Sequence, residues 1–292
     1  MNLTRSYAKL IRPKQWLKNL FLFAPLIFAK ELFDPVQVLT SLKAFVAFCL
    51  TASAAYIIND IADIEADRVH AEKRNRPLAA GILTTRKAIA LLGVLLTGVT
   101  VLLIDADARF AAILAAYFLM NLAYSLKLKE VVLLDVFIIA AGFMMRVLGG
   151  AYAINVQVST WIVLCTLFIS LFLGFAKRRA EIVMAHQSGS SSERKVLSHY
   201  RVDFIDQMLT IAAAATVISY ALYTVAPRTI EVFGTDKMIY TTIFVIFGIF
   251  RYLYLVHMTS STESPTNAVT SDWPIITTTL LWIVTCIILI YI

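Results

Sequence analysis

The sequence predicts an all-α polytopic membrane protein, built as a bundle of about nine transmembrane helices. The 292 residues are 60% hydrophobic and only 15% charged, with a mean hydropathy of +0.78. Average soluble chains are roughly 25% charged and 45–50% apolar. Apolar runs of the roughly 17–25 residues that span a bilayer recur along the whole chain. These runs are too long, and alternate too little, for the strands of a membrane barrel.

Nine apolar runs are separated by polar or charged segments, and we take each run as one transmembrane helix. The first run is interrupted by Pro25, and the separation of the third run from the fourth is the weakest. We assign all of them to a single integral-membrane domain over residues 1–292. The expected spans are residues 16–34, 37–59, 86–104, 110–126, 131–153, 159–176, 206–226, 238–257 and 274–292.

Lysine and arginine are distributed unevenly between the two sides of the predicted bundle. Of the 26 Lys and Arg residues, 19 fall on one side, four on the other and three within spans. By the positive-inside rule the basic side is cytoplasmic. We therefore expect a multi-pass protein of the inner (cytoplasmic) membrane. Its net charge of +7 is explained by this topology, without nucleic-acid binding.

Acidic residues gather in NDIADIEADRVHAEKRNRP, residues 59–77, at the cytoplasmic end of the second span. On a continuous helix, Asp60, Asp63 and Asp67 would lie within about 60° of one another. Three carboxylates on one face repel each other unless a cation lies among them. Mg²⁺ binds through carboxylates together with substrate phosphates. The three aspartates are therefore our candidate metal ligands and catalytic residues.

Three basic residues follow the aspartates within the same loop. Lys73, Arg74 and Arg76 could hold the phosphates that the metal bridges, because their cationic groups form charge-assisted hydrogen bonds to phosphate. Such a site would be incomplete without a phosphorylated ligand. The alternative is a solvated, ion-paired loop, although charges at the mouth of a spanning helix are costly to place near hydrocarbon.

The segment NDIADIEAD, which begins at Asn59, matches the Asn-Asp-x-x-Asp-x-x-x-Asp motif of the UbiA superfamily of intramembrane prenyltransferases. It lies at the end of the second span and is followed by KRNRPLAAG, as in that superfamily. The resemblance implies a bundle of nine helices that binds a Mg²⁺-diphosphate substrate at its cytoplasmic mouth. It also adds Asn59 to the substrate-binding candidates.

The segment after the sixth span distinguishes the branches of this superfamily. The aromatic prenyltransferases carry a second aspartate-rich motif there, whereas this chain reads GFAKRRAEIVMAHQSG. Lys177, Arg178 and Arg179 stand where acids would be expected, and Glu181 is the only acid of the stretch. A site that exchanges carboxylates for cations should hold one metal fewer and one phosphate more.

The chain as a whole resembles the polyprenyl-phosphate phosphoribosyltransferase branch. The implied substrates are 5-phosphoribosyl 1-diphosphate and a polyprenyl phosphate such as decaprenyl phosphate, with release of diphosphate. The basic cluster after the sixth span then has a candidate ligand, the 5-phosphate of the donor. The segments that carry the resemblance are RPKQWLKN (12–19), YSLKLKEVVLLDVFIIAAGFMMRVLGG (124–150), KRRAE (177–181) and SERKVLSHY (192–200).

Some substrate-binding candidates come from these segments and keep a structural alternative. Lys18 and Asn19 could line the donor site, or the segment could simply anchor the chain at the membrane interface. Tyr124, Lys127 and Lys129 match the middle segment, and their alternative role is inside-positive anchoring. The sequence does not choose between these roles.

Charged residues within or near the spans form the last group of candidates. Asp135 and Arg146 are eleven residues apart and share one face of the fifth span. Charged side chains at such depth usually face a cavity or a partner. Arg146 therefore either binds a phosphate or holds helices together. For Lys177 and Glu181 the alternative to substrate binding is an ordinary i, i+4 ion pair.

Two other functions compete with phosphoribosyl transfer. A prenyltransferase would move a polyprenyl group from its diphosphate to an aromatic acceptor, usually with the second acidic motif that this chain lacks. A lipid transporter or flippase would show internal repeats and ionisable residues at mid-membrane. Here the ionisable residues gather at one mouth, which favours an enzyme. The sequence leaves open whether the chain acts alone or as a homo-oligomer.

Overall fold

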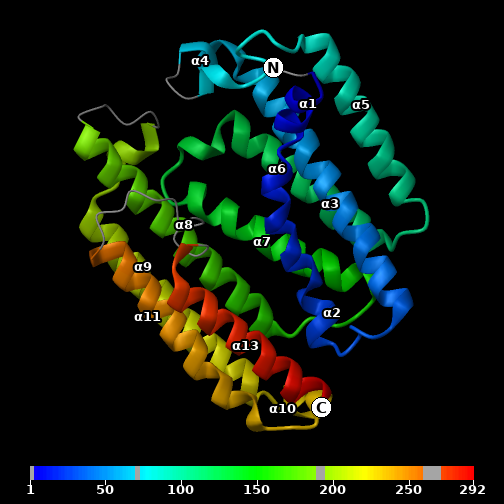
Figure 1. The fold of residues 1–292 in the computed structure, drawn as a ribbon, viewed down its shortest axis with the longest axis vertical. Coiled ribbons are helices and arrows are strands. Elements are labelled where there is room, and N and C mark those ends of the chain that lie inside the picture. The colour runs from blue at the N-terminus through cyan, green and yellow to red at the C-terminus, as the bar shows by residue number, and fades with distance from the viewer. Residues whose placement is uncertain (1–2, 70–72, 189–194, 259–270) are drawn as a thin grey trace. The chain divides into compact units, whose positions relative to one another are not determined.

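The computed structural model of the chain describes residues 3–69, 73–188, 195–258 and 271–292 (Figure 1). Within these residues every regular element is an α-helix or a 3₁₀-helix, and eight segments are long and apolar enough to cross a membrane. The predicted all-α, multi-pass membrane fold is therefore confirmed. The eight segments are Pro35–Ala62, Thr85–Leu102, Ala108–Leu126, Leu134–Ala153, Thr160–Met184, Val202–Val225, Lys237–Met258 and Trp273–Tyr291.

The first predicted span, residues 16–34, is not a continuous α-helix. A 3₁₀-helix, η1 (Pro13–Phe23), leads into a short α-helix, α2 (Ala24–Phe28). Pro25 lies in the first turn of α2. Because proline lacks an amide hydrogen and its ring clashes with the preceding turn, an unbroken α-helix through this position is disfavoured. The segment is therefore a broken element that packs along α3 (Pro35–Ala62).

The chain forms two compact units, residues 1–129 with 145–157 and residues 130–144 with 158–292. Helix α7 (Leu134–Ala153) contributes its first half to the second unit and its last turns to the first. Among the described residues, two hydrophobic clusters lie in the first unit and one lies in the second. The assignment of residues 1–292 to a single domain stays a prediction.

Helix α3 is the central element of the first unit. The helices α1 (Leu3–Ile11), α5 (Thr85–Leu102) and α6 (Ala108–Leu126), together with η1, pack against it (Figure 1). The buried residues of α3 are mostly small, which allows close approach of neighbouring backbones. In the same unit the backbones of α7 and η1 also lie close together, because a Cβ added at Gly150 would lie 2.0 Å from the carbonyl oxygen of Leu22.

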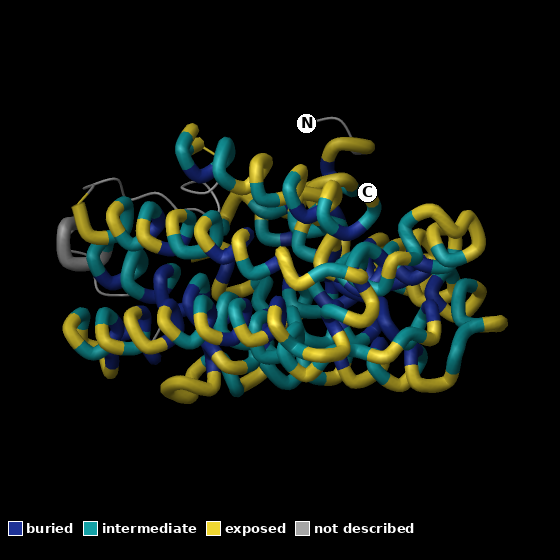
Figure 2. Tube along the Cα trace, turned by 90° about the horizontal axis from the view of Figure 1, so that it is seen from below, coloured by how far each residue is buried: buried dark blue, intermediate teal, exposed yellow. Residues whose placement is uncertain are grey.

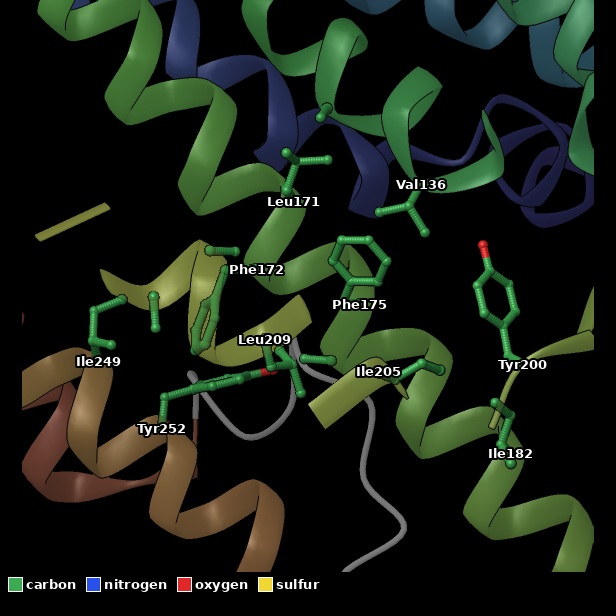
Figure 3. Packing of buried hydrophobic residues seen from close by; sticks show 14 of the residues in the cluster. Val136, Leu171, Phe172, Phe175, Ile182, Tyr200, Ile205, Leu209, Ile249 and Tyr252 are labelled. Atoms are coloured by element: carbon green, nitrogen blue, oxygen red, sulfur yellow. The ribbon is translucent and has the colours of Figure 1, made fainter. Parts of the chain in front are cut away.

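The second unit is organised around α8 (Thr160–Ser188) and α9 (Val202–Val225), which pack along each other. The helices α11 (Thr242–Met258) and α13 (Trp273–Tyr291) also pair. Figure 3 shows the buried side chains between these elements, with Phe172 close to Tyr252. The shorter elements of the chain are α4 (Ile64–Val69), η2 (Lys73–Asn75), η3 (Leu128–Glu130), η4 (Lys195–His199), α10 (Pro227–Phe233) and η5 (Lys237–Thr241).

Helix α8 extends well beyond the end predicted for the sixth span at residue 176. Its sequence after that point, KRRAEIVMAH (177–186), contains good helix formers and neither glycine nor proline. The helix therefore continues to Ser188. Lys177, Arg178 and Glu181, which the sequence places after the sixth span, therefore lie on a continuation of its helix.

Large apolar side chains remain exposed along the predicted spans, such as Phe250 in α11 and Leu280 in α13. Figure 2 shows exposed residues recurring along individual helices. In a soluble protein, large contiguous apolar surfaces mark interaction or aggregation sites. In a bilayer the same side chains meet hydrocarbon, which agrees with the membrane assignment.

Candidate active site

The aspartate motif lies at the junction of α3 and α4. Asn59 and Asp60 occupy the last turn of α3, Asp63 is the C-cap, and Asp67 lies in α4. Backbone hydrogen bonds from Asp63 N to Asn59 O (2.9 Å) and from Asp67 N to Asp63 O (2.8 Å) continue across the junction. At Asp63, however, the backbone leaves the helical region, with φ −96° and ψ 9°. The continuous helix assumed from the sequence is therefore interrupted inside the motif.

Asp60 and Asp67 converge on one guanidinium group. Nη1 of Arg76 donates to Oδ1 of Asp60 at 3.1 Å and to Oδ2 of Asp67 at 2.7 Å. Both acidic residues are buried, with 2% and 3% of their surface exposed. A buried carboxylate is costly unless it is paired with a positive charge. The two carboxylates thus form a site that already binds a cationic group.

Asp63 does not join this pair. Its Oδ2 lies 3.6 Å from Nζ of Lys129. Among the residues that the structure describes, no three His, Cys, Asp or Glu side chains gather as a potential metal site. The predicted common face of three aspartates is therefore only partly present, because the helix is interrupted at Asp63. The remaining pair still fits Mg²⁺, which often binds through one or two carboxylates and is completed by substrate phosphates and water.

Further basic candidates of the first unit lie in two short segments, one that follows the motif and one at the end of α6. Lys73 is half-buried and Arg74 is exposed, both in η2. Tyr124, half-buried, and Lys127, exposed, lie at the end of α6. The ion pair of Asp63 with Lys129, just beyond α6, brings the middle segment beside the aspartate motif. These positions agree with a phosphate-binding role without testing it.

Asn19 and Arg146 meet inside the first unit. Nε of Arg146 donates to Oδ1 of Asn19 at 2.7 Å, and Nη2 donates to the hydroxyl of Tyr117 at 2.8 Å. Nδ2 of Asn19 donates in turn to Sγ of Cys49 at 3.1 Å. Arg146 therefore links η1, α6 and α7, as the structural alternative predicts. Its binding of phosphate stays a prediction, as does donor binding by the half-buried Lys18.

The second unit contains a buried ionic network of its own. Nε of Arg178 lies 3.1 Å from Oδ2 of Asp135, and Nη1 of Arg178 pairs with Glu181 along α8. The hydroxyl of Tyr200 donates to Oδ1 of Asp135 at 2.8 Å and accepts from the amide of Leu133 at 2.6 Å. The network joins α8, the start of α7 and the residue after η4. Both Asp135 and Arg178 have no exposed surface, so the network orders this region from within.

Tyr200 and Arg12 were both missed by sequence reasoning as individual site residues. Burial raises the pKa of the Tyr200 phenol above its usual range, and the hydrogen bond to Asp135 raises it further. The phenol is therefore a neutral donor at physiological pH. Figure 3 shows Tyr200 as one of the buried residues in the hydrophobic cluster of the second unit. Both residues fall in segments that carried the resemblance; of SERKVLSHY, residues 192–194 lie outside the described residues.

The chain is a multi-pass helical bundle, and a buried aspartate pair lies with basic side chains at the end of one span. These features are typical of membrane-embedded enzymes that act on phosphorylated substrates. The UbiA prenyltransferase family matches residues 20–268. The chain belongs to this family.

Two curated relatives are named decaprenyl-phosphate phosphoribosyltransferase. The protein of Mycolicibacterium smegmatis is 37% identical over 226 residues, which is 76% of this chain and 71% of that protein. The protein of Corynebacterium glutamicum is 38% identical over 227 residues, 76% of this chain and 68% of that protein. Among solved structures, a UbiA homologue from Archaeoglobus fulgidus bound to GPP and Mg²⁺ matches with a TM-score of 0.73 at 17% identity, covering 98% of this chain and 100% of that one. That likeness supports the fold.

Proposed function

We propose that this protein transfers the 5-phosphoribosyl group from 5-phosphoribosyl 1-diphosphate to a polyprenyl phosphate and releases diphosphate. The observation that carries the proposal is the similarity, over about three quarters of the chain, to proteins named decaprenyl-phosphate phosphoribosyltransferase. The buried aspartate pair with its arginine partner supports it, because the donor brings a diphosphate that such a site would bind with Mg²⁺.

The aspartate motif would hold the metal. The shared contact of Asp60 and Asp67 with Arg76 supports this role, and Asp63 is the third ligand expected from the motif. Mg²⁺ bound there would neutralise part of the charge on the leaving diphosphate. Asn59 lies one residue before Asp60 and would orient the same ligand.

The reaction exchanges one bond at C1 of the ribose. The C1–O bond to diphosphate breaks, the diphosphate leaves with the bonding electron pair, and an oxygen of the lipid phosphate forms the new C1–O bond. Such glycosyl transfers pass through an oxocarbenium-like transition state. The second pKa of a phosphate monoester is about 6, so the lipid phosphate is already largely an anion at pH 7. No general base is required.

Basic side chains would then supply most of the remaining stabilisation. Arg76, Lys73 and Arg74 would donate to the diphosphate as its charge develops, which is the electrostatic form of catalysis. Lys177 is half-buried on α8 and is our candidate for the 5-phosphate of the ribose. Arg178 would act through the buried network instead, by holding Glu181 in place. Further proposed substrate-binding residues are Lys18, Asn19, Tyr124, Lys127, Lys129, Asp135 and Arg146.

The cellular setting follows from the charge distribution. The aspartate motif lies in a segment rich in Lys and Arg, and such segments face the cytoplasm. We therefore place the protein in the inner membrane with this site open to the cytoplasm. The polyprenyl chain would lie among the helices in the bilayer, with its phosphate at the membrane surface.

Turnover with purified protein tests the proposal. Protein in lipid nanodiscs, given 5-phosphoribosyl 1-diphosphate, decaprenyl phosphate and Mg²⁺, should form a phosphoribosyl lipid and release diphosphate, and chelation of the metal should stop both. A parallel reaction contains a polyprenyl diphosphate and an aromatic acceptor. Consumption of that pair, with the ribose donor untouched, would mean prenyl transfer. Lipid movement across vesicles without turnover would mean transport.

A further inference from the structure

Arg12 lies where the chain passes from α1 into η1, directly beside the first aspartate of the motif. Its Nη2 forms an ion pair with Oδ1 of Asp60, the same oxygen that accepts from Arg76 at 3.1 Å. Its guanidinium carbon lies 4.7 Å from the ring centre of Tyr56, one turn earlier in α3. The Arg12 side chain is 25% exposed. It therefore contacts a buried carboxylate and remains accessible to a ligand.

The backbone holds Arg12 in an unusual conformation. Its φ of 53° and ψ of 58° lie in the left-handed region that residues other than glycine rarely adopt. Ser53 of α3 holds the chain before and after Arg12. Its Oγ donates to the carbonyl of Ile11 at 2.8 Å and accepts from Nε1 of Trp16 at 3.1 Å. Figure 1 shows α1 and the following segment running along α3. Strained residues of this kind cluster at ligand-binding sites, where the surrounding structure maintains them.

We propose that Arg12 is a further phosphate-binding residue of the donor site, which exchanges Asp60 for a phosphate oxygen when the metal-bound diphosphate binds. The inference rests on the proposed function. Asp60 and Asp67 carry two negative charges, and Arg12 and Arg76 carry two positive ones. This set suits a ligand that brings cation and anion together: the metal takes the carboxylates and the arginines take the phosphate oxygens.

The contact with Tyr56 makes this exchange feasible. The aromatic ring attracts the guanidinium through its face and leaves the N–H groups available for another acceptor. Arg12 can therefore leave Asp60 and still keep one protein contact. The segment 12–19, in which the resemblance to the phosphoribosyltransferase branch begins, thereby gains a role at the diphosphate.

Removal of the Arg12 charge should change two binding affinities in opposite directions, that for a metal ion alone and that for the metal–diphosphate complex. Without Arg12, Asp60 has one competing cation fewer, so a metal ion alone binds more tightly. The diphosphate loses a charge-assisted hydrogen bond, so the metal–diphosphate complex binds more weakly. If Arg12 only held the segment after α1 against α3, its removal would weaken both affinities or change neither.

The experiment compares full-length Arg12→Gly and Arg12→Gln with wild type. The control is Arg5→Gln, which removes the same charge from an exposed position of α1. Glycine adopts the left-handed conformation without strain, so Arg12→Gly retains the backbone and loses only the side chain. Binding of Mn²⁺ alone is titrated by EPR, and binding of inorganic diphosphate with Mg²⁺ is titrated by calorimetry. Both Arg12 variants should bind Mn²⁺ more tightly and Mg²⁺-diphosphate about tenfold more weakly. The Arg5→Gln variant should match wild type.

Unchanged affinity of Arg12→Gly for Mg²⁺-diphosphate would overturn the inference, and so would weaker binding of Mn²⁺. Thermal unfolding of each variant establishes that the compared proteins are folded. Inorganic diphosphate contains no ribose, so the result does not depend on the identity of the donor. Failure of wild type to bind 5-phosphoribosyl 1-diphosphate would contradict the proposed function and leave the result for Arg12 standing.

Discussion

Asp60 is buried at the end of α3, and its environment depends on residues that are distant in sequence. Arg76 reaches it from 16 residues away, and Arg12 from 48 residues away. The spacing of the motif identified the acids, because helical periodicity relates residues three to seven positions apart. It could not identify their cationic partners, since contacts over such separations follow from how the segments pack.

The aspartate motif gives a direct test at this scale. Asp60→Asn and Asp63→Asn should each lower kcat/KM for the ribose donor by at least about a hundredfold, because each removes a charge that would hold the metal–diphosphate complex. Asp63→Asn should leave expression and melting temperature almost unchanged, whereas Asp60→Asn should lower the melting temperature, because Asp60 is buried against Arg12 and Arg76. The matched control is Glu65→Gln, which removes an exposed acid of the same segment that pairs with Arg68.

Steady-state rates with purified variants, at saturating lipid phosphate, provide the measurement. Near-normal rates in both aspartate variants would remove the metal hypothesis. A comparable loss in Glu65→Gln would show that the whole segment, and not its inward-facing acids, controls activity.

The elements differ from their predicted forms where a local signal competes with an apolar run. The first run contains Pro25 and becomes η1 and α2, although its hydropathy alone suggested one span. The sixth apolar run ends at residue 176, yet α8 continues to Ser188, because the charged residues that follow are good helix formers. Hydropathy predicts where a helix can cross a membrane, whereas propensity and breakers decide where it ends.

The crossing of η1 and α7 makes an element-scale prediction about stability. In Gly150→Ala the new Cβ would lie 2.0 Å from the backbone oxygen of Leu22, so one segment must move. Such overpacking typically costs about 1–3 kcal/mol. The control is Gly93→Ala in α5, where a Cβ meets nothing within 4 Å. There alanine should be neutral or stabilising by up to about 1 kcal/mol, because it is the better helix former.

Thermal unfolding of both variants in the same detergent measures the difference. A lower melting temperature for Gly150→Ala, with no decrease for Gly93→Ala, is the expected result. Equal melting temperatures for the two would mean that η1 and α7 do not approach each other this closely.

At the scale of the whole molecule, charge decides orientation and apolar surface decides location. The Lys and Arg residues fall mainly in the segments on one predicted side, and the predicted spans keep large apolar side chains exposed. Both features are properties of the chain as a whole, and neither depends on a particular contact. The charge distribution and the apolar runs could therefore be identified in the sequence, and they predicted the multi-pass fold.

Orientation can be tested with single cysteines. After replacement of Cys49, Cys165 and Cys286, which lie within spans, one cysteine is introduced at the exposed Glu65 or at the exposed Asp236. In intact spheroplasts a membrane-impermeant maleimide should label only the cysteine at position 236. The cysteine at position 65 should react once the membrane is opened, because its segment is predicted to be cytoplasmic. The reverse pattern would invert the topology and place the candidate site outside.

The sequence by itself determined the class of fold and the approximate positions of the eight long apolar helices, and it singled out the acids and bases that we propose to bind a metal–phosphate ligand. These follow from composition, from run length and from spacing within a helix, all of which are local. Only the tertiary structure decided that Asp60 and Asp67 share Arg76, that Asp63 faces Lys129, and that Arg12 belongs to the same cluster. Those choices depend on the break at Asp63 and on packing between distant segments, where the cost of burying an unpaired charge selects the partners.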